Sequence, residues 1–334
     1  MEQSDETSTR EPDKAAIDAS QPGSMTISAD ASAHVQASAF GDALLRLLQR
    51  IQKEDALVLS PLRLVLLTAE LGNVVSRWQR ALGLPEAGVS QQPEGTAVGK
   101  TMSWGRDAES ARSLIILADY MAAGIVMNNT VAISTFVHEL GHVHDDFSRG
   151  VVLGFRDSQT SPASNDWPRI CAYVAEIIWG EYAAESVAAS YLAHDDLRAL
   201  LVNDPLHLAG IDQRLRQAVW SYKCRRQTLV SLWNGSVAEF SDMFANLGRA
   251  VARLAFADNY EESLVRLAHP NNEAARWESV VKRLVQELEA LGSTGYSKWG
   301  SAPFSGLQEV IAEGFQAVGL FPIYDGGTLN VRVR

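Results

Sequence analysis

The sequence predicts an α+β fold that is mainly α, with a small β-sheet and a helix-rich C-terminal half. Apolar residues recur at helical spacing along most of the 334-residue chain, and most regularly from residue 170 to about 291. Short apolar runs at 113–117 and 124–127 have the length of strands, and residues 320–334 alternate around a Gly-Gly turn. A hydrophobic content of 46% is enough to bury a large core.

Residues 1–37 are predicted to form a disordered leader, because they are rich in Ser, Ala, Asp and Thr and almost free of large apolar side chains. Their charged start shows no secretory signal, so we expect cytoplasmic residence, although export without an N-terminal signal would leave no trace. The most apolar window, 113–137, contains Asp119, Asn128 and Asn129. We therefore expect no membrane-spanning helix and no membrane partner.

Helices are expected over 40–52 and over 61–84, the second beginning at a proline suited to a first turn. Residues 85–112 are rich in Gly, Gln, Pro and Ser and are expected to be irregular. The runs 113–117 and 124–127 are readable as two strands, although 121–127 could equally be helical. The next helix has a plausible start, since Asn128, Asn129 and Thr130 offer capping groups before an apolar run.

Residues 138–142 read His-Glu-Leu-Gly-His. On a helix, His138 and His142 lie one turn apart on the same face, so both imidazoles can reach one metal ion. Glu139 lies beside them, where a general base for a metal-activated water is expected. Residues 135–137, 140, 141 and 143 are uncharged, as is usual around such a motif, whereas His144 departs from the pattern. His144 points away from the ligand face and is expected near solvent or behind the ligands.

Two histidines leave a tetrahedral site short of a protein ligand. Asp146 lies one turn past His142, but it is further along the helix axis and is better explained as a residue behind the ligands or as a solvated charge near the end of the helix. The better candidate lies in the helical segment 170–192, which places Glu181, Glu185 and Ala188 on one stripe. Small residues on that segment would let a neighbouring helix approach closely, and Gly141 would meet that approach.

Glu181 could then complete the metal site, and Glu185 could hydrogen-bond a ligating imidazole and fix its tautomer. The alternative is a surface helix with two exposed carboxylates. We prefer the metal site because both glutamates are embedded among Ala, Val, Trp and Tyr, whereas Glu176 falls on another face.

His138 to His142, followed some forty residues later by Glu181-Tyr-Ala-Ala-Glu185-Ser-Val-Ala, resembles a gluzincin-type HExxH zinc metallopeptidase, nearest to the ImmA/IrrE-like group. The resemblance implies a zincin-like core with Zn²⁺ bound by His138, His142 and Glu181. It also implies Glu139 as general base and acid, Glu185 as support for the ligands, and a protein or peptide as substrate. The sequence departs from the family at Val187, where Phe is frequent, at Glu185, where Asn or Asp is commoner, and at His144.

The resemblance covers only the two segments that carry the motifs, so the rest of the organisation is read from patterns. We expect a leader over 1–37, a mostly helical zincin-like domain over 38–292, and a C-terminal helix and β-hairpin over 293–334 packed on the same domain. Residues 151–168 should form a long loop, and breaks are expected near Pro205, at 234–235 and at 270–272. A loop over 292–304, a helix over 306–318 and a hairpin over 320–334 should follow.

Composition excludes several partners. With 40 acidic and 29 basic residues the net charge is −11, which disfavours binding to nucleic acid or anionic lipid. Cys171 and Cys224 are too few for a disulfide framework, although a single bridge is possible. Residues 95–101 resemble a phosphate-binding loop but have three residues between the glycines where four are needed, so nucleotide binding is not expected.

The leading hypothesis is therefore a zinc-dependent peptidase, and the alternative is a metallopeptidase-like protein that regulates a partner without cleaving it. A purely structural zinc site is disfavoured, because such sites usually have four protein ligands. Tyr182, His207 and Tyr222 are unranked candidates for stabilising an oxyanion, and His194 could lie near the site. The substrate and the oligomeric state stay open.

Overall fold

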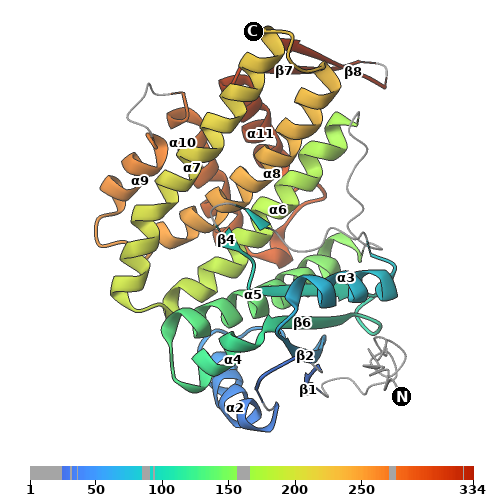
Figure 1. Ribbon diagram of the computed structural model, residues 1–334, viewed down its shortest axis with the longest axis vertical. Coiled ribbons are helices and arrows are strands. Elements are labelled where there is room, and N and C mark those ends of the chain that lie inside the picture. Colours follow the sequence, from blue (N-terminus) through green and yellow to red (C-terminus); the bar gives the residue numbers. More distant parts are fainter. Residues whose placement is uncertain are drawn as a thin grey trace, which may run out of the picture. The chain divides into compact units, whose positions relative to one another are not determined.

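The computed structural model describes residues 25–30, 32–35, 37–84, 91–92, 95–155, 166–270, 276–325 and 327–334. The chain divides into two compact units, Met1–Gln159 and Thr160–Arg334, which we call the N-terminal and the C-terminal unit. The fold is α+β and mainly helical with small sheets, as the sequence predicts (Figure 1). Most of the predicted leader, residues 1–24, lies outside the described residues.

The N-terminal unit is built on a four-stranded sheet with the order β1-β2-β6-β5. Strands β1 (Thr26–Ala29), β2 (Leu62–Thr68) and β6 (Arg112–Ala118) are parallel, and β5 (Gly99–Trp104) pairs antiparallel with β6 at the edge of the sheet. Strand β1 falls within the predicted leader, which is therefore partly ordered. It is held by parallel pairing with β2, a non-local contact that composition does not reveal.

Side chains alternate between the two faces of this sheet. Helix α3 (Leu71–Leu82) covers one face, where Trp78 packs on Leu64, Met102 and Leu114. Helices α2 (Ala37–Glu54), α4 (Asp119–Val126) and α5 (Thr130–Leu153) also pack on the sheet, and α5 contacts β5 and β6. Thr101 directly precedes Met102 in β5, and neighbouring residues of a strand point to opposite faces. The Thr101 side chain therefore leaves the sheet on the face opposite α3.

Two expectations for this unit are corrected, and one open choice is decided. The helix predicted over 61–84 is strand β2 followed by α3. Of the two interpretations of 124–127, the helical one is confirmed, because these residues lie at the end of α4 and in the turn after it. The region expected to be irregular, 85–112, contains β5. It also contains β3 (Gln91–Gln92) and β4 (Gly95–Thr96), which pair with each other. The segment 95–101, which resembles a phosphate-binding loop, thus forms β4 and the start of β5. The helix predicted over 40–52 is confirmed as α2.

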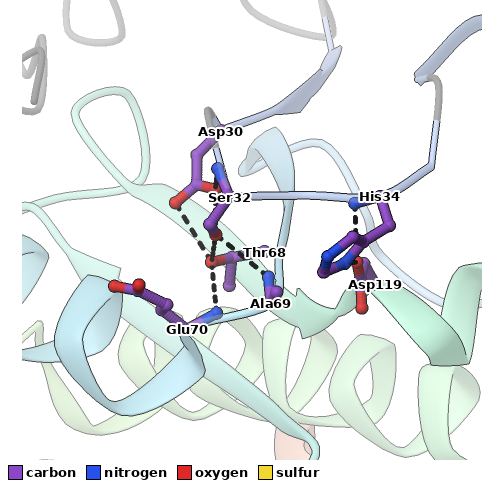
Figure 2. Close-up of polar contacts among 7 residues, drawn as sticks. All are labelled: Asp30, Ser32, His34, Thr68, Ala69, Glu70 and Asp119. Atoms are coloured by element: carbon purple, nitrogen blue, oxygen red, sulfur yellow. Dashed lines mark hydrogen bonds and ion pairs between the residues drawn. The ribbon is translucent and has the colours of Figure 1, made fainter. Parts of the chain in front are cut away.

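A network of hydrogen bonds joins the carboxyl ends of the parallel strands, as Figure 2 shows. Asp30, which follows β1, accepts hydrogen bonds from the Ser32 backbone and from Thr68 Oγ1 at the end of β2, at 2.8 and 3.0 Å. His34 donates its backbone N–H to Asp119 Oδ2, at the start of α4, over 2.7 Å. These contacts fasten the segment after β1 to the ends of β2 and β6.

The C-terminal unit is a helical assembly that ends in a β-hairpin (Figure 1). Its three long helices, α6 (Trp167–Ala188), α7 (His194–Lys223) and α8 (Leu229–Leu254), pack on one another, with α8 in contact with both α6 and α7. A Cβ at Gly248 would lie 2.6 Å from the carbonyl oxygen of Ile178, so glycine is what allows α8 to approach α6 this closely. The remaining helices are α9 (Tyr260–Ala268), α10 (Glu278–Thr294) and α11 (Ser305–Ala317), with 3₁₀ turns η1 (Ala189–Tyr191) and η2 (Tyr296–Lys298).

Two predicted breaks in this unit are wrong. Pro205 lies inside α7 and residues 234–235 lie inside α8, because both helices are held by tertiary packing that outweighs local propensity. The hairpin is confirmed as β7 (Leu320–Asp325) and β8 (Thr328–Val333), and the helix over 306–318 as α11. The predicted loop over 151–168 is shorter at both ends, since α5 runs to Leu153 and α6 starts at Trp167; residues 156–165 lie outside the described part.

Within the part of the chain that the structure describes, no single helix has both the length and the apolar composition needed to cross a bilayer. Helices α4 and α5 pass that composition test only when taken together, and they are bent by 117° at the turn between them.

Candidate metal centre

The two histidines of the pentapeptide lie on α5, in the N-terminal unit. The helix starts where the sequence predicts, because the side chain of Asn129 accepts a hydrogen bond of 3.0 Å from the backbone N–H of Ala132. His138 and His142 follow two turns later, one turn apart, and both are half-buried. Their Nε2 atoms are 3.1 Å apart, and the ring planes are nearly perpendicular, at 85°.

The distance between the two Nε2 atoms suits the binding of a single metal ion by both histidines. With Zn–N bonds of about 2.0–2.1 Å at a tetrahedral angle, two ligating nitrogens are separated by roughly 3.3 Å. The observed 3.1 Å is close to that separation, and it is also the length of a hydrogen bond in which one Nε2 donates to the other. Phe136, Val137, Leu140 and Val143 are fully buried around them, which fixes the helix rotation that aims the two rings.

Glu139 is buried beside the histidines, with 7% of its surface exposed. Thr101 on the edge strand β5 donates a hydrogen bond of 2.6 Å from Oγ1 to Glu139 Oε2, and Oγ1 also lies 3.0 Å from the Glu139 backbone oxygen. A Cβ added at Gly99 would lie 2.9 Å from Glu139 Oε1. The carboxylate is thus held at one oxygen by Thr101 and given room at the other by Gly99.

His144 and Asp146, which follow the pentapeptide, have structural partners. His144 Nδ1 accepts a hydrogen bond of 2.9 Å from the backbone N–H of Val58, and burial lowers the pKa of His144 despite the opposing charge of Asp145. The half-buried ring is therefore bound to the segment before β2 and is not surrounded by solvent. Asp146 forms an ion pair with Arg149 at 2.7 Å, consistent with its expected role as a charge outside the ligand set.

Glu181 and Glu185 lie on α6, in the C-terminal unit, and each faces an arginine of α8. Arg249 Nε lies 3.3 Å from Glu181 Oε2, and Arg253 Nε donates a hydrogen bond of 2.6 Å to Glu185 Oε1. The pairs share one spacing, because the two glutamates and the two arginines are each one helical turn apart. The alternative of two exposed carboxylates on a surface helix does not hold for Glu185, which is 4% exposed.

Arg253 is the centre of a buried charge cluster. Besides Glu185 it binds Asp204 of α7, with Nη1 at 2.8 and 3.1 Å from the two carboxylate oxygens. Burial raises the pKa of Asp204, although the charge of Arg253 acts in the opposite direction. Burial by itself would lower the pKa of Arg253, but the carboxylates of Glu185 and Asp204 outweigh it and raise that pKa. One guanidinium thus compensates the buried carboxylate of Glu185 on α6 and the half-buried carboxylate of Asp204 on α7.

Several weaker candidates have other surroundings. Tyr182 is packed in an aromatic cluster with Trp179, and burial raises its pKa. His194 is largely exposed and faces Asp258 at 3.2 Å. Cys171 is buried, Cys224 is exposed, and both are free thiols, so the possible single bridge is absent between them.

The sequence did not indicate the residues that lie outside the motifs and contact the proposed site residues. Thr101, Gly99, Arg249 and Arg253 carry no signature of their own. The polar-apolar alternation around Thr101 could have indicated the edge strand, and the equal spacing of Arg249 and Arg253 to that of the two glutamates was visible in the sequence.

Comparison with known proteins adds no relative: no protein-family model matches the chain, and neither a curated protein nor a solved structure shows a significant match. What this centre does must therefore be argued from its residues.

Proposed function

We propose that the chain is a zinc-dependent peptidase that hydrolyses peptide bonds in a protein or peptide substrate. The observation that carries this proposal is the pair of imidazoles 3.1 Å apart, on a buried helix, with the carboxylate of Glu139 in the same pentapeptide. Imidazole nitrogens favour zinc among abundant divalent ions, although the donors alone do not exclude others. Glu181 is proposed as the third ligand on the strength of the motif resemblance.

A bound zinc ion would polarise the scissile carbonyl and lower the pKa of a water molecule. The chain's own part is proton transfer. Glu139 takes one proton from the attacking water as the water oxygen forms a bond to the carbonyl carbon. It then delivers that proton to the amide nitrogen as the C–N bond breaks, so that a carboxylic acid and an amine leave the site.

Strand β5 supports an assignment of peptide as the substrate. It is the edge of the sheet and lies against the helix that carries the pentapeptide, in contact with Glu139 through Thr101. The outer edge of such a strand offers backbone N–H and C=O groups, to which an extended peptide can add as a further strand. Recognition of this kind depends on the substrate backbone and would allow varied side chains.

The test is to measure bound metal and cleavage together. The purified chain, loaded with zinc and dialysed, should retain stoichiometric zinc and cleave members of a library of unstructured peptides. The double variant His138→Ala and His142→Ala should lose both. Zinc retention without cleavage of any peptide would instead favour the alternative, a metallopeptidase-like regulatory protein, for which the structural ion pairs of Glu181 and Glu185 are an independent reason.

A further inference from the structure

We infer that Thr101 is a positioning residue for Glu139, so that the edge strand of the sheet orients the general base. This inference rests on the proposed function and adds to it a residue outside both motifs. Its basis is a contact within the N-terminal unit: Thr101 Oγ1 donates a hydrogen bond of 2.6 Å to Glu139 Oε2.

The hydroxyl of Thr101 is itself held in place. Strand β5 is paired with β6 over its whole length, Thr101 standing opposite Ile115, which is completely buried. As a β-branched residue in a strand, Thr101 has few χ1 rotamers, so its hydroxyl has little freedom to turn away. A hydrogen bond to a charged acceptor from such a fixed donor selects one rotamer of the Glu139 side chain.

Gly99 acts on the other oxygen. Because alternate residues of a strand share a face, Gly99 and Thr101 both lie on the side of α5. A Cβ at position 99 would lie 2.9 Å from Glu139 Oε1 and 3.0 Å from the side chain of Leu117. The carboxylate of Glu139 therefore fills the space that glycine leaves. Its Oε2 accepts the hydrogen bond from Thr101, so the proton of the attacking water would be taken up by Oε1.

Positioning of this kind affects the rate of the chemical step and not metal binding or substrate affinity. Displacement of a catalytic group by about 1 Å can reduce the rate about 100-fold. Loss of the Thr101 hydroxyl should consequently lower kcat, leave zinc content unchanged, and leave KM almost unchanged. A residue that only stabilises the fold would instead alter the amount of folded, zinc-loaded protein without changing kcat of that fraction.

The experiment compares Thr101→Val, which keeps the shape and removes the hydroxyl, with Thr101→Ser, which keeps the hydroxyl. The matched control is Ser113→Ala, on the neighbouring strand β6, whose hydroxyl lies 2.9 Å from that of Ser103 and not at Glu139. With a peptide that the zinc-loaded wild type cleaves, we expect Thr101→Val to lower kcat by about 10- to 100-fold. Thr101→Ser should stay within about 3-fold of wild type, and Ser113→Ala should have the wild-type kcat.

Gly99→Ala is a second, independent variant, because it pushes on Oε1 while the Thr101 hydroxyl stays; its kcat should also fall. Wild-type kcat in zinc-loaded Thr101→Val would overturn the inference and leave the proposed function intact. Failure of Thr101→Ser to restore the rate would overturn it as well. If the zinc-loaded wild type cleaves no peptide, the proposed function fails, and the role of Thr101 in it fails with it.

Discussion

The guanidinium of Arg253 donates a hydrogen bond of 2.6 Å to Glu185, and both side chains are nearly completely buried. This contact ties α8 to α6, and the bond from Arg253 to Asp204 extends it to α7. Glu185 therefore has a role in the C-terminal unit whether or not it also supports a metal ligand.

Replacement of Arg253 by Met should destabilise the protein strongly, because the buried Glu185 and the half-buried Asp204 would lose their compensating charge. We expect a loss of about 3–5 kcal/mol in the free energy of unfolding, measured by denaturant titration. The control is Lys282→Met, which removes an exposed ion pair with Glu278 and should leave the free energy of unfolding almost unchanged. Equal effects of the two substitutions would contradict a central role for Arg253.

Gly248 offers a test of the close approach between α6 and α8. Gly248→Ala places a Cβ 2.6 Å from a backbone oxygen that cannot rotate away, so we expect a loss of about 1–3 kcal/mol in stability. Gly235→Ala is the matched control on the same helix, since nothing lies within 4 Å of its added Cβ. There the better helix propensity of Ala should leave stability unchanged or raise it by up to about 1 kcal/mol. Similar midpoints of thermal unfolding for both variants would refute this account of the packing.

The proposed third ligand can be separated from its structural neighbour. Glu181→Gln should weaken zinc binding by at least about 10-fold, since it removes a charged donor, while the fold persists with Arg249 still half-exposed to water. Glu176→Gln, on another face of α6, should keep wild-type affinity. Competition against a coloured chelator measures both. An unchanged zinc affinity in Glu181→Gln would remove this residue from the ligand set.

Asp119 predicts a dependence of stability on pH. Burial alone would raise the pKa of this carboxyl, but hydrogen bonds from the backbone and the ring of His34 outweigh it and lower the pKa below the ordinary value of 3.8. Because the folded-state pKa is the lower one, its contribution is complete above pH 3.8 and is lost as the pH falls through the folded value. Asp119→Asn should thus cost about 1–2 kcal/mol at neutral pH, and the difference from wild type should shrink in acid. A difference in unfolding free energy that did not change with pH would argue against this linkage.

The two cysteines should differ sharply in reactivity. Burial raises the pKa of Cys171 to about 12, so almost no thiolate forms at neutral pH, and its side chain is also inaccessible. Cys224 is exposed. Mass spectrometry after brief iodoacetamide treatment of the folded protein should find alkylation at Cys224 alone; modification of both thiols at similar rates would show that α6 opens readily.

The sequence predicted the fold class, the start of α5 and the C-terminal hairpin, because each depends on local patterns: helical spacing, a capping asparagine and a turn between alternating residues. Strand β2 was misread as part of a helix because its run from Leu62 to Leu67 is apolar throughout apart from Arg63, and it is buried on both faces. Uniformly apolar runs have no period that would distinguish a strand from a buried helix. Pro205 was misread for the opposite reason, since local propensity yielded to tertiary packing in α7.

For the candidate centre, the pentapeptide gave the positions of His138, Glu139 and His142, because a one-turn spacing on a helix fixes which side chains meet. Thr101 and Gly99 could not be predicted, since their contact with Glu139 spans 38 and 40 positions along the chain and depends on the pairing of β5 with β6. Arg249 and Arg253 have the same spacing as Glu181 and Glu185 in the sequence, but that spacing alone does not indicate that α8 packs on α6.

The most direct test of the central claim is the rate of peptide cleavage by zinc-loaded Glu139→Gln beside the wild type, with zinc measured in both. The amide keeps the size of the side chain but cannot accept the proton of the attacking water. We predict that the wild type cleaves unstructured peptides and that Glu139→Gln retains zinc while losing cleavage by at least about 100-fold. Full activity in zinc-loaded Glu139→Gln would contradict the proposed mechanism.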